Sequence, residues 1–137
     1  MHSNDDVPPG FEPIVTSPFI EYLGRFHWLP GTGRFGMHVR PEHANTHGNA
    51  HGGFLASIVD VACSRGTRFA LGDGSTVSTI TMTLDYLEPV DVGRWFEVDT
   101  TVDRAGGRTV FTTGRVVVDE KVLAKASVVL ARHRPRP

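Results

Sequence analysis

One stretch of this chain has the apolar spacing of a single amphipathic helix, and the stretch after it has the spacing of strands. Apolar and small residues recur at three- and four-residue intervals from Leu55 to Phe69, and Gly72 then supplies a stop. A lone helix beside so much strand can bury its apolar face only if the sheet wraps around it. Apolar and polar residues alternate in the segments 79–86, 96–103 and 122–130, and 109–118 is the segment richest in β-branched residues. In segment 79–86, strict alternation places Thr79 on the opposite face from Met82.

The residues before the helix predict smaller elements. A short helical turn is expected at 19–23, and apolar runs at 25–29 and 34–40 flank Pro30-Gly31-Thr32-Gly33, which predicts a hairpin. Residues 41–53 are rich in Pro, Gly, Asn and His and predict a loop. We therefore expect an α+β protein, with about six antiparallel strands wrapped around one long central helix. The order of the strands in the sheet does not follow from periodicity.

Length and composition fit one domain. The chain has 137 residues, of which 39% are hydrophobic and 21% charged, close to the averages for a globular domain. We expect a single domain at 19–132, preceded by a flexible arm at 1–18 that is rich in proline and followed by a polar tail at 133–137. A domain of this size leaves apolar surface that association can cover, so oligomers are permitted.

The charge balance argues against two classes of partner. Fourteen Lys and Arg against fifteen Asp and Glu give a formal charge of -1, which provides no basic surface for nucleic acid or an anionic membrane. No apolar run approaches the roughly 20 residues of a membrane-spanning helix. The single cysteine, Cys63, forms no internal disulfide, and the N-terminus lacks the pattern of a signal peptide. These features predict a cytoplasmic protein.

A glycine pair stands directly before the helix. Gly52 and Gly53 would place backbone N–H groups without intrahelical partners in the first turn, where the helix dipole adds positive potential. The absence of side chains would let a substrate carbonyl approach these amides closely. The alternative is that both glycines only permit a tight turn into the helix.

An acidic residue interrupts the apolar stretch in the middle of the helix. Asp60 shares a face with Gly53, Ser57 and Ser64, so that face is narrow and polar. A solvated carboxylate is one interpretation. The other is that a ligand or a second copy of the helix packs there, and that the desolvated carboxylate acts as a base or a nucleophile.

Three histidines, His43, His47 and His51, are spaced by four and would form a metal site if their segment were helical. The prolines, glycines and asparagines around them favour a loop instead, so we expect no metal and no cofactor. Cys63 lies near the apolar stripe and is expected to be a small buried residue rather than a nucleophile.

Several of these residues together resemble a known family. Asn45, His51-Gly52-Gly53, Asp60, Thr79 and the run Leu84-Asp85-Tyr86-Leu87-Glu88-Pro89 are similar to the hotdog-fold acyl-CoA thioesterases, in particular the phenylacetate-degradation (PaaI-like) branch. The resemblance covers residues 19 to 131. It implies a hotdog fold that forms dimers, commonly dimers of dimers, with acyl-CoA bound at the subunit interface and hydrolysed to a free acid and coenzyme A.

The resemblance also implies roles for single residues. Asp60 corresponds to the general base or nucleophile, and the backbone N–H of Gly52 to the group that polarises the thioester carbonyl. Asn45 and His51 correspond to residues near the leaving sulfur, and Thr79 to a hydroxyl that helps to orient water. We further expect Gly53 and Phe54 beside the acyl group, and Arg104 and Arg108 beside the phosphates of coenzyme A.

Helix geometry suggests where such a site is assembled. Asp60 is seven residues beyond Gly53, roughly 10 Å along the axis at 1.5 Å per residue, and an Asp side chain does not close that gap. The hypothesis is a composite site, with Asn45, His51 and Gly52 from one chain facing Asp60 and Thr79 of its two-fold mate. The alternative function is an acyl-CoA-binding sensor or structural subunit of the same fold without turnover.

Overall fold

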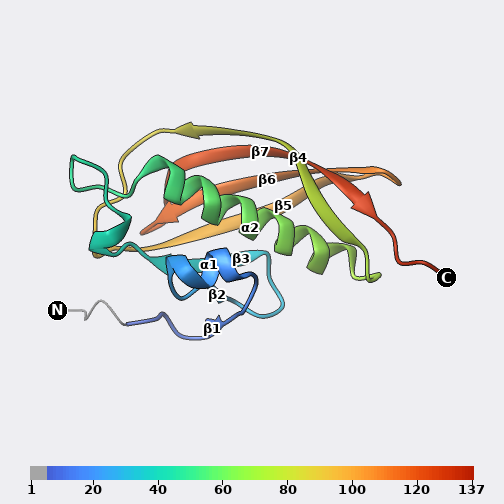
Figure 1. The fold of residues 1–137 in the computed structure, drawn as a ribbon, viewed down its shortest axis with the longest axis horizontal. Coiled ribbons are helices and arrows are strands. Elements are labelled where there is room, and N and C mark those ends of the chain that lie inside the picture. The colour runs from blue at the N-terminus through green and yellow to red at the C-terminus, as the bar shows by residue number, and fades with distance from the viewer. Residues whose placement is uncertain (1–5) are drawn as a thin grey trace.

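A computed structural model of the protein describes residues 6–137. One long helix, α2 (Gly52–Leu71), lies along the inner face of a curved sheet (Figure 1). Before it come the short helix α1 (Pro18–Leu23) and a 3-10 turn at Pro41–His43. The strands are β1 (Glu12–Pro13), β2 (His27–Trp28), β3 (Arg34–His38), β4 (Thr76–Tyr86), β5 (Trp95–Ala105), β6 (Thr109–Val118) and β7 (Lys121–His133).

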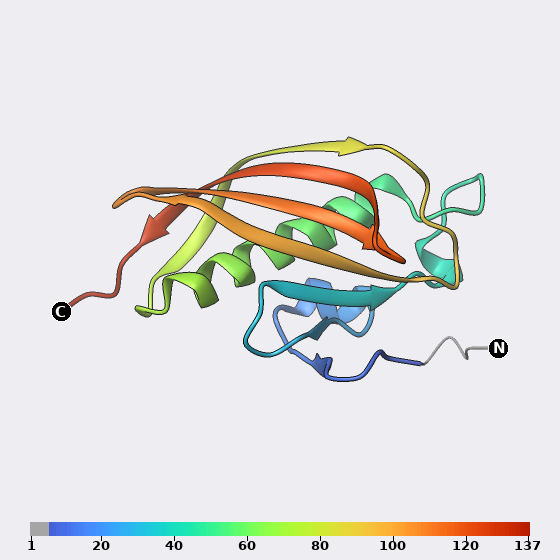
Figure 2. The same cartoon turned by 180° about the vertical axis from the view of Figure 1, so that it is seen from behind.

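The seven strands form one antiparallel sheet in the order β1-β2-β3-β5-β6-β7-β4. Seen from behind, the long strands bend over α2 along its whole length (Figure 2). This arrangement confirms the predicted hotdog architecture of a sheet around a central helix. Strand β4 is at one end of the sheet and therefore has a free edge. No helix among residues 6–137 has both the length and the apolar character to cross a membrane.

The seventh strand lies in the segment predicted as an arm. Glu12 and Pro13 pair with Trp28 and His27 of β2, and the ring of Phe11 packs edge-on against Trp95 at 5.2 Å. Periodicity missed this strand because two residues are too few to show alternation.

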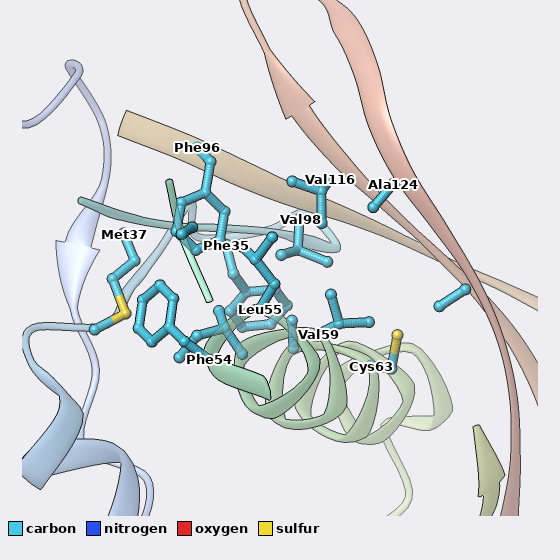
Figure 3. Packing of buried hydrophobic residues seen from close by; sticks show 14 of the residues in the cluster. Phe35, Met37, Phe54, Leu55, Val59, Cys63, Phe96, Val98, Val116 and Ala124 are labelled. Atoms are coloured by element: carbon cyan, nitrogen blue, oxygen red, sulfur yellow. The ribbon is translucent and has the colours of Figure 1, made fainter. Parts of the chain in front are cut away.

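Helix α2 begins and ends where the sequence predicts. His51 caps its first turn by accepting the Gly53 N–H on Nδ1, and Gly72 closes it in the left-handed conformation at φ 63°. The predicted apolar stripe faces the sheet, with Ile58, Val59 and Ala62 fully buried. Figure 3 shows Leu55, Val59 and Cys63 of α2 directed toward Phe96 and Val98 of β5 and Val116 of β6. Burial of this stripe is the main stabilising contribution that the helix makes.

A β-bulge in β4 corrects one prediction from strict alternation. Thr79 pairs with Leu130 and Met82 with Val128, whereas Thr81 pairs with Val129, so Ile80 is the extra residue of the bulge. Leu130 and Val128 are both buried beneath α2. Directly paired residues share a face, so Thr79 and Met82 both point toward the helix, not to opposite faces as predicted.

Helix α2 packs tightly against β5 at Gly66. A Cβ built on Gly66 would lie 2.1 Å from Oγ1 of Thr100, which is itself buried and donates a hydrogen bond to the Gly33 carbonyl. This contact predicts that Gly66→Ala lowers the free energy of unfolding by about 1–2 kcal/mol, because the overpacking cost exceeds the gain in helix propensity. Urea denaturation measures the change.

Gly107→Ala is the matched control, since a Cβ there would have only one neighbour, Nη2 of Arg134 at 4.0 Å. It should change stability by no more than about 0.5 kcal/mol. If Gly66→Ala and Gly107→Ala had the same free energy of unfolding, the close packing of α2 against Thr100 would not require a glycine at position 66.

Candidate active site

The bulge brings the carboxylate of α2 and the hydroxyl of β4 together. Oγ1 of Thr79 donates a hydrogen bond of 2.6 Å to Oδ1 of Asp60. Asp60 is half-buried on the side of α2 that carries Ser57 and Ser64, both of which are also half-buried. The Thr79 bond fixes the carboxylate and leaves Oδ2 directed elsewhere, as a base or nucleophile on this face requires.

A second group of predicted residues lies at the start of α2. An open cavity of about 320 Å³ is lined there by Gly52 and Leu55 of the helix, by Asn45, Asn49 and Ala50 of the preceding loop, and by residues 86–90. Asp60 and Thr79 are not among the lining residues. Within one chain the structure therefore brings the predicted residues together in two groups, Asp60 with Thr79 and Asn45 with Gly52.

The peptide between Gly52 and Gly53 is held at both of its polar atoms. Its N–H, which belongs to Gly53, donates to Nδ1 of His51 at 2.9 Å, and its carbonyl accepts the hydroxyl of Tyr86 at 2.5 Å. The amide of Gly53 is therefore occupied. The N–H of Gly52 belongs to the preceding peptide, has no intrahelical acceptor because it opens the helix, and is bonded to no acceptor in the described part of the chain.

Asn45 organises the loop that forms one wall of the cavity. Its side-chain oxygen accepts the backbone N–H of His47 at 2.9 Å and of Asn49 at 3.1 Å. This is the Asx-turn use of an asparagine, and it engages the oxygen but not the amide NH₂. The NH₂ group is the end of Asn45 that can donate to a ligand in the cavity.

The three histidines of this loop have separate roles. Both ring nitrogens of buried His43 are engaged by backbone groups, Nδ1 by the Arg40 N–H and Nε2 by the Leu23 carbonyl, and its ring stacks on Phe54 at 3.9 Å. His47 is exposed in the loop, and His51 caps α2. Residues 6–137 contain no cluster of three or more side chains arranged as metal ligands.

The predicted substrate contacts are spread more widely. Phe54 is buried in the core, where its ring also meets Phe96 edge-on, so it supports the helix start and does not line the cavity. Arg104 and Arg108 are exposed at the β5–β6 hairpin, at the opposite end of α2 from Gly52 (Figure 1). The chain alone therefore does not place either arginine beside the cavity.

Cys63 is a core residue. Desolvation by burial, with a smaller contribution from the Asp60 charge, raises the pKa of its thiol to about 12, so it stays protonated at neutral pH. Its sulfur packs against Gly114 of β6, where a Cβ would lie 2.7 Å away. These observations agree with the prediction of a small buried residue.

Tyr86 lies in the 84–89 run that carries the resemblance, but the sequence assigned it no role in the site. It ends the alternating segment of β4 and falls 34 residues after Gly52, so no local spacing connects the two. The close contact appears only in the structure, where a Cβ on Gly52 would lie 3.2 Å from both Cζ and the hydroxyl oxygen of Tyr86.

The chain is similar to known proteins over most of its length. The family model of the thioesterase superfamily matches residues 47–125. A Pseudomonas aeruginosa protein named "putative esterase" is 33% identical, with 95% of this chain and 98% of that protein covered. An acyl-coenzyme A thioesterase of Xenopus laevis is 32% identical over 50% of this chain and 30% of its own length. A crystallised mutant of the phenylacetic acid degradation protein PaaI of Thermus thermophilus is 27% identical, with a TM-score of 0.74 over 84% of this chain and 98% of that one.

The family model covers more than half of the chain, and the Pseudomonas relative covers nearly all of it. The PaaI structure has the same architecture as this chain. We conclude that this chain belongs to the thioesterase superfamily and is a hotdog-fold enzyme of the PaaI-like type.

Proposed function

We propose that the protein hydrolyses an acyl-CoA thioester to a carboxylic acid and coenzyme A, at a site that two copies of the chain build together. The observation that carries this proposal is the division of the site residues within one chain. Gly52 and Asp60 are eight residues apart on one helix, about 12 Å along its axis, so one carbonyl cannot meet both.

The Gly52 end of the site supplies the hydrogen-bond donor that polarises the substrate carbonyl. A thioester oxygen that accepts the free Gly52 N–H would be stabilised as it gains negative charge, and the positive end of the α2 dipole strengthens that interaction. The cavity in front of this amide has the room for the reacting end of an acyl thioester.

The Asp60 end supplies the attacking oxygen. Asp60 either takes a proton from a water molecule that adds to the carbonyl carbon, or adds its own Oδ2 to that carbon, and both routes remain in the proposal. In the first route the water oxygen forms the new bond to carbon, the carbon–sulfur bond breaks, and the proton ends on the thiolate of coenzyme A. In the second route the Oδ2–carbon bond forms and the carbon–sulfur bond breaks, which gives an anhydride. Water then hydrolyses this anhydride, which releases the acid, frees Asp60 and supplies the proton for the thiolate. Thr79 holds the carboxylate through its 2.6 Å bond in either route.

The leaving thiolate requires a donor, and the loop before α2 provides two. Because Nδ1 of His51 accepts the Gly53 N–H, the neutral ring carries its proton on Nε2, which is therefore a donor. The NH₂ group of Asn45 is the second donor, since the oxygen of that side chain is engaged within the loop. We assign both to the sulfur end of the bond that breaks.

The surface that α2 and β4 present supports the composite arrangement. The Asp60 side of α2 carries small residues that allow a second helix to approach closely, and β4 beside it has a free edge. A two-fold mate whose α2 runs antiparallel would place its Asp60 beside Gly52 of this chain, and Asp60 of this chain would lie beside the mate's Gly52. Pairing of such dimers into a tetramer is part of the proposal.

Arg104 and Arg108 stay in the proposal as contacts for the phosphates of coenzyme A. They lie far from Gly52 of their own chain, so they would serve the site that contains the mate's Gly52. We propose a cytoplasmic location, which the single free cysteine supports.

A panel of aryl and fatty acyl-CoAs, assayed with a thiol-trapping reagent, tests the function. The reagent reports released coenzyme A without interference from the protein, because Cys63 is buried. We expect multiple turnovers with at least one acyl class. The ranking of the rates with different acyl groups then identifies the substrate. Tight binding of acyl-CoA with no release across the panel would support the sensor instead and overturn the enzyme assignment.

A further inference from the structure

We propose that Tyr86 is a positioning residue, which acts through the Gly52–Gly53 peptide to aim the Gly52 N–H at the substrate carbonyl. This inference rests on the proposed function, because it assumes that the Gly52 amide polarises the thioester. It adds a residue from outside the helix and its loop to the machinery of the site.

The first observation is that one peptide is fixed from two sides. Tyr86 donates its hydroxyl to the Gly52 carbonyl at 2.5 Å, and His51 Nδ1 accepts the Gly53 N–H at 2.9 Å. A peptide is planar, so holding its oxygen and its nitrogen fixes the whole plane. The plane in turn fixes the Gly52 Cα, and because Gly52 is the first residue of α2 and has helical backbone angles, it restrains the direction of the preceding N–H.

The second observation is the contact between the ring and the backbone. A Cβ at Gly52 would lie 3.2 Å from Cζ and from the hydroxyl oxygen of Tyr86, tighter than most side-chain contacts. Glycine therefore allows the phenol to reach the carbonyl. Partial desolvation raises the pKa of Tyr86, which is 51% exposed, so the phenol keeps its proton and remains a donor throughout the neutral range.

The third observation is where Tyr86 is anchored. It is the last residue of β4, where it pairs with Ala124 of β7, and its ring lines the same cavity as Asn45 and Gly52. The same strand carries Thr79, which holds Asp60. Strand β4 thus fixes one side chain against each half of the site, and a paired strand is a rigid support for that task.

Tyr86→Phe tests the inference, because it removes the hydroxyl and leaves the ring. The Gly52 amide would still be present but less well aimed, so we expect kcat to fall roughly tenfold, less than the 10²–10³ that loss of an oxyanion donor costs. KM should stay within about twofold of the wild-type value, because an interaction that forms only in the transition state does not change substrate binding. The matched control is Tyr22→Phe, since Tyr22 is the other tyrosine and is 87% exposed on α1.

A change in KM at constant kcat would make Tyr86 an ordinary substrate contact and overturn the inference. Unchanged kinetics in Tyr86→Phe would overturn it as well. Amide hydrogen exchange supplies a readout that does not need activity, and the Gly53 N–H should exchange faster in Tyr86→Phe than in Tyr22→Phe. Equal exchange in the two variants would show that the hydroxyl does not hold the peptide.

Failure of this inference and failure of the proposed function give different results. If wild-type protein releases coenzyme A and Tyr86→Phe releases it with the same kinetics, the positioning role is wrong and the function stands. If wild-type protein releases none, the function is wrong, and the exchange experiment still decides whether Tyr86 holds the helix start.

Discussion

Asp60→Asn should lower kcat at least about a hundredfold, the lower part of the range for a positioned acid–base group, and leave the fold intact. The amide has the same shape as the carboxylate and still accepts the Thr79 hydroxyl, so the hydrogen bond at this position survives. An amide is neither a base nor a nucleophile at neutral pH. Steady-state release of coenzyme A, with circular dichroism to verify the fold, measures the effect.

The chain offers a matched control for this substitution. Oδ2 of Asp103 accepts the hydroxyl of Thr113 at 2.5 Å in an exposed pair between β5 and β6, which repeats the Asp60–Thr79 contact away from α2. Asp103→Asn should therefore keep full activity. If both variants kept the wild-type rate, Asp60 would have no part in the chemistry.

Gly52→Pro should lower kcat by roughly 10²–10³, because it removes the one amide hydrogen that is proposed to stabilise the thioester oxygen. Proline is well tolerated at the first position of a helix, where Gly52 stands. His51 before it has φ -61° and ψ 137°, the extended conformation that a residue preceding proline adopts. The substitution thus deletes a hydrogen-bond donor with little disturbance of the backbone.

Gly52→Ala separates the amide from the added side chain. It keeps the N–H and places a Cβ 3.2 Å from the Tyr86 ring, as proline also does, so the two variants differ in the N–H and in the remaining ring atoms of proline but share the added Cβ. We expect Gly52→Ala to be at least tenfold faster than Gly52→Pro. Equal rates for the two would exclude the Gly52 amide as the polarising group.

The elements that sequence reasoning predicted well are those whose signal is local. The helix stripe from Leu55 to Phe69, its stop at Gly72 and the hairpin turn before Arg34 all depend on residues within a few positions of each other. Side-chain periodicity and glycine conformation decide such features, so the chain shows them without its partners in space. The single-helix pattern was enough to require a wrapped sheet.

The features that were missed depend on contacts distant in sequence. The bulge at Ile80, which turns Thr79 toward Asp60, is set by pairing with β7 about 50 residues later, and alternation alone cannot reveal an inserted residue. Tyr86 reaches Gly52 across 34 residues for the same reason. Phe54 was expected to line or to support the acyl pocket, and burial of its ring against His43 agrees with the supporting role.

Mixing two inactive variants tests the two-chain site most directly. Asp60→Asn chains are co-refolded with Gly52→Pro chains in equal amounts, and native mass spectrometry verifies that mixed dimers form. Random pairing makes about half of the dimers mixed, and each mixed dimer has one site with both groups intact and one with both defective. The composite site predicts recovery to roughly a quarter of the wild-type rate. If mixed dimers form and the rate stays at that of the single variants, Gly52 and Asp60 do not act from different chains and the account is wrong.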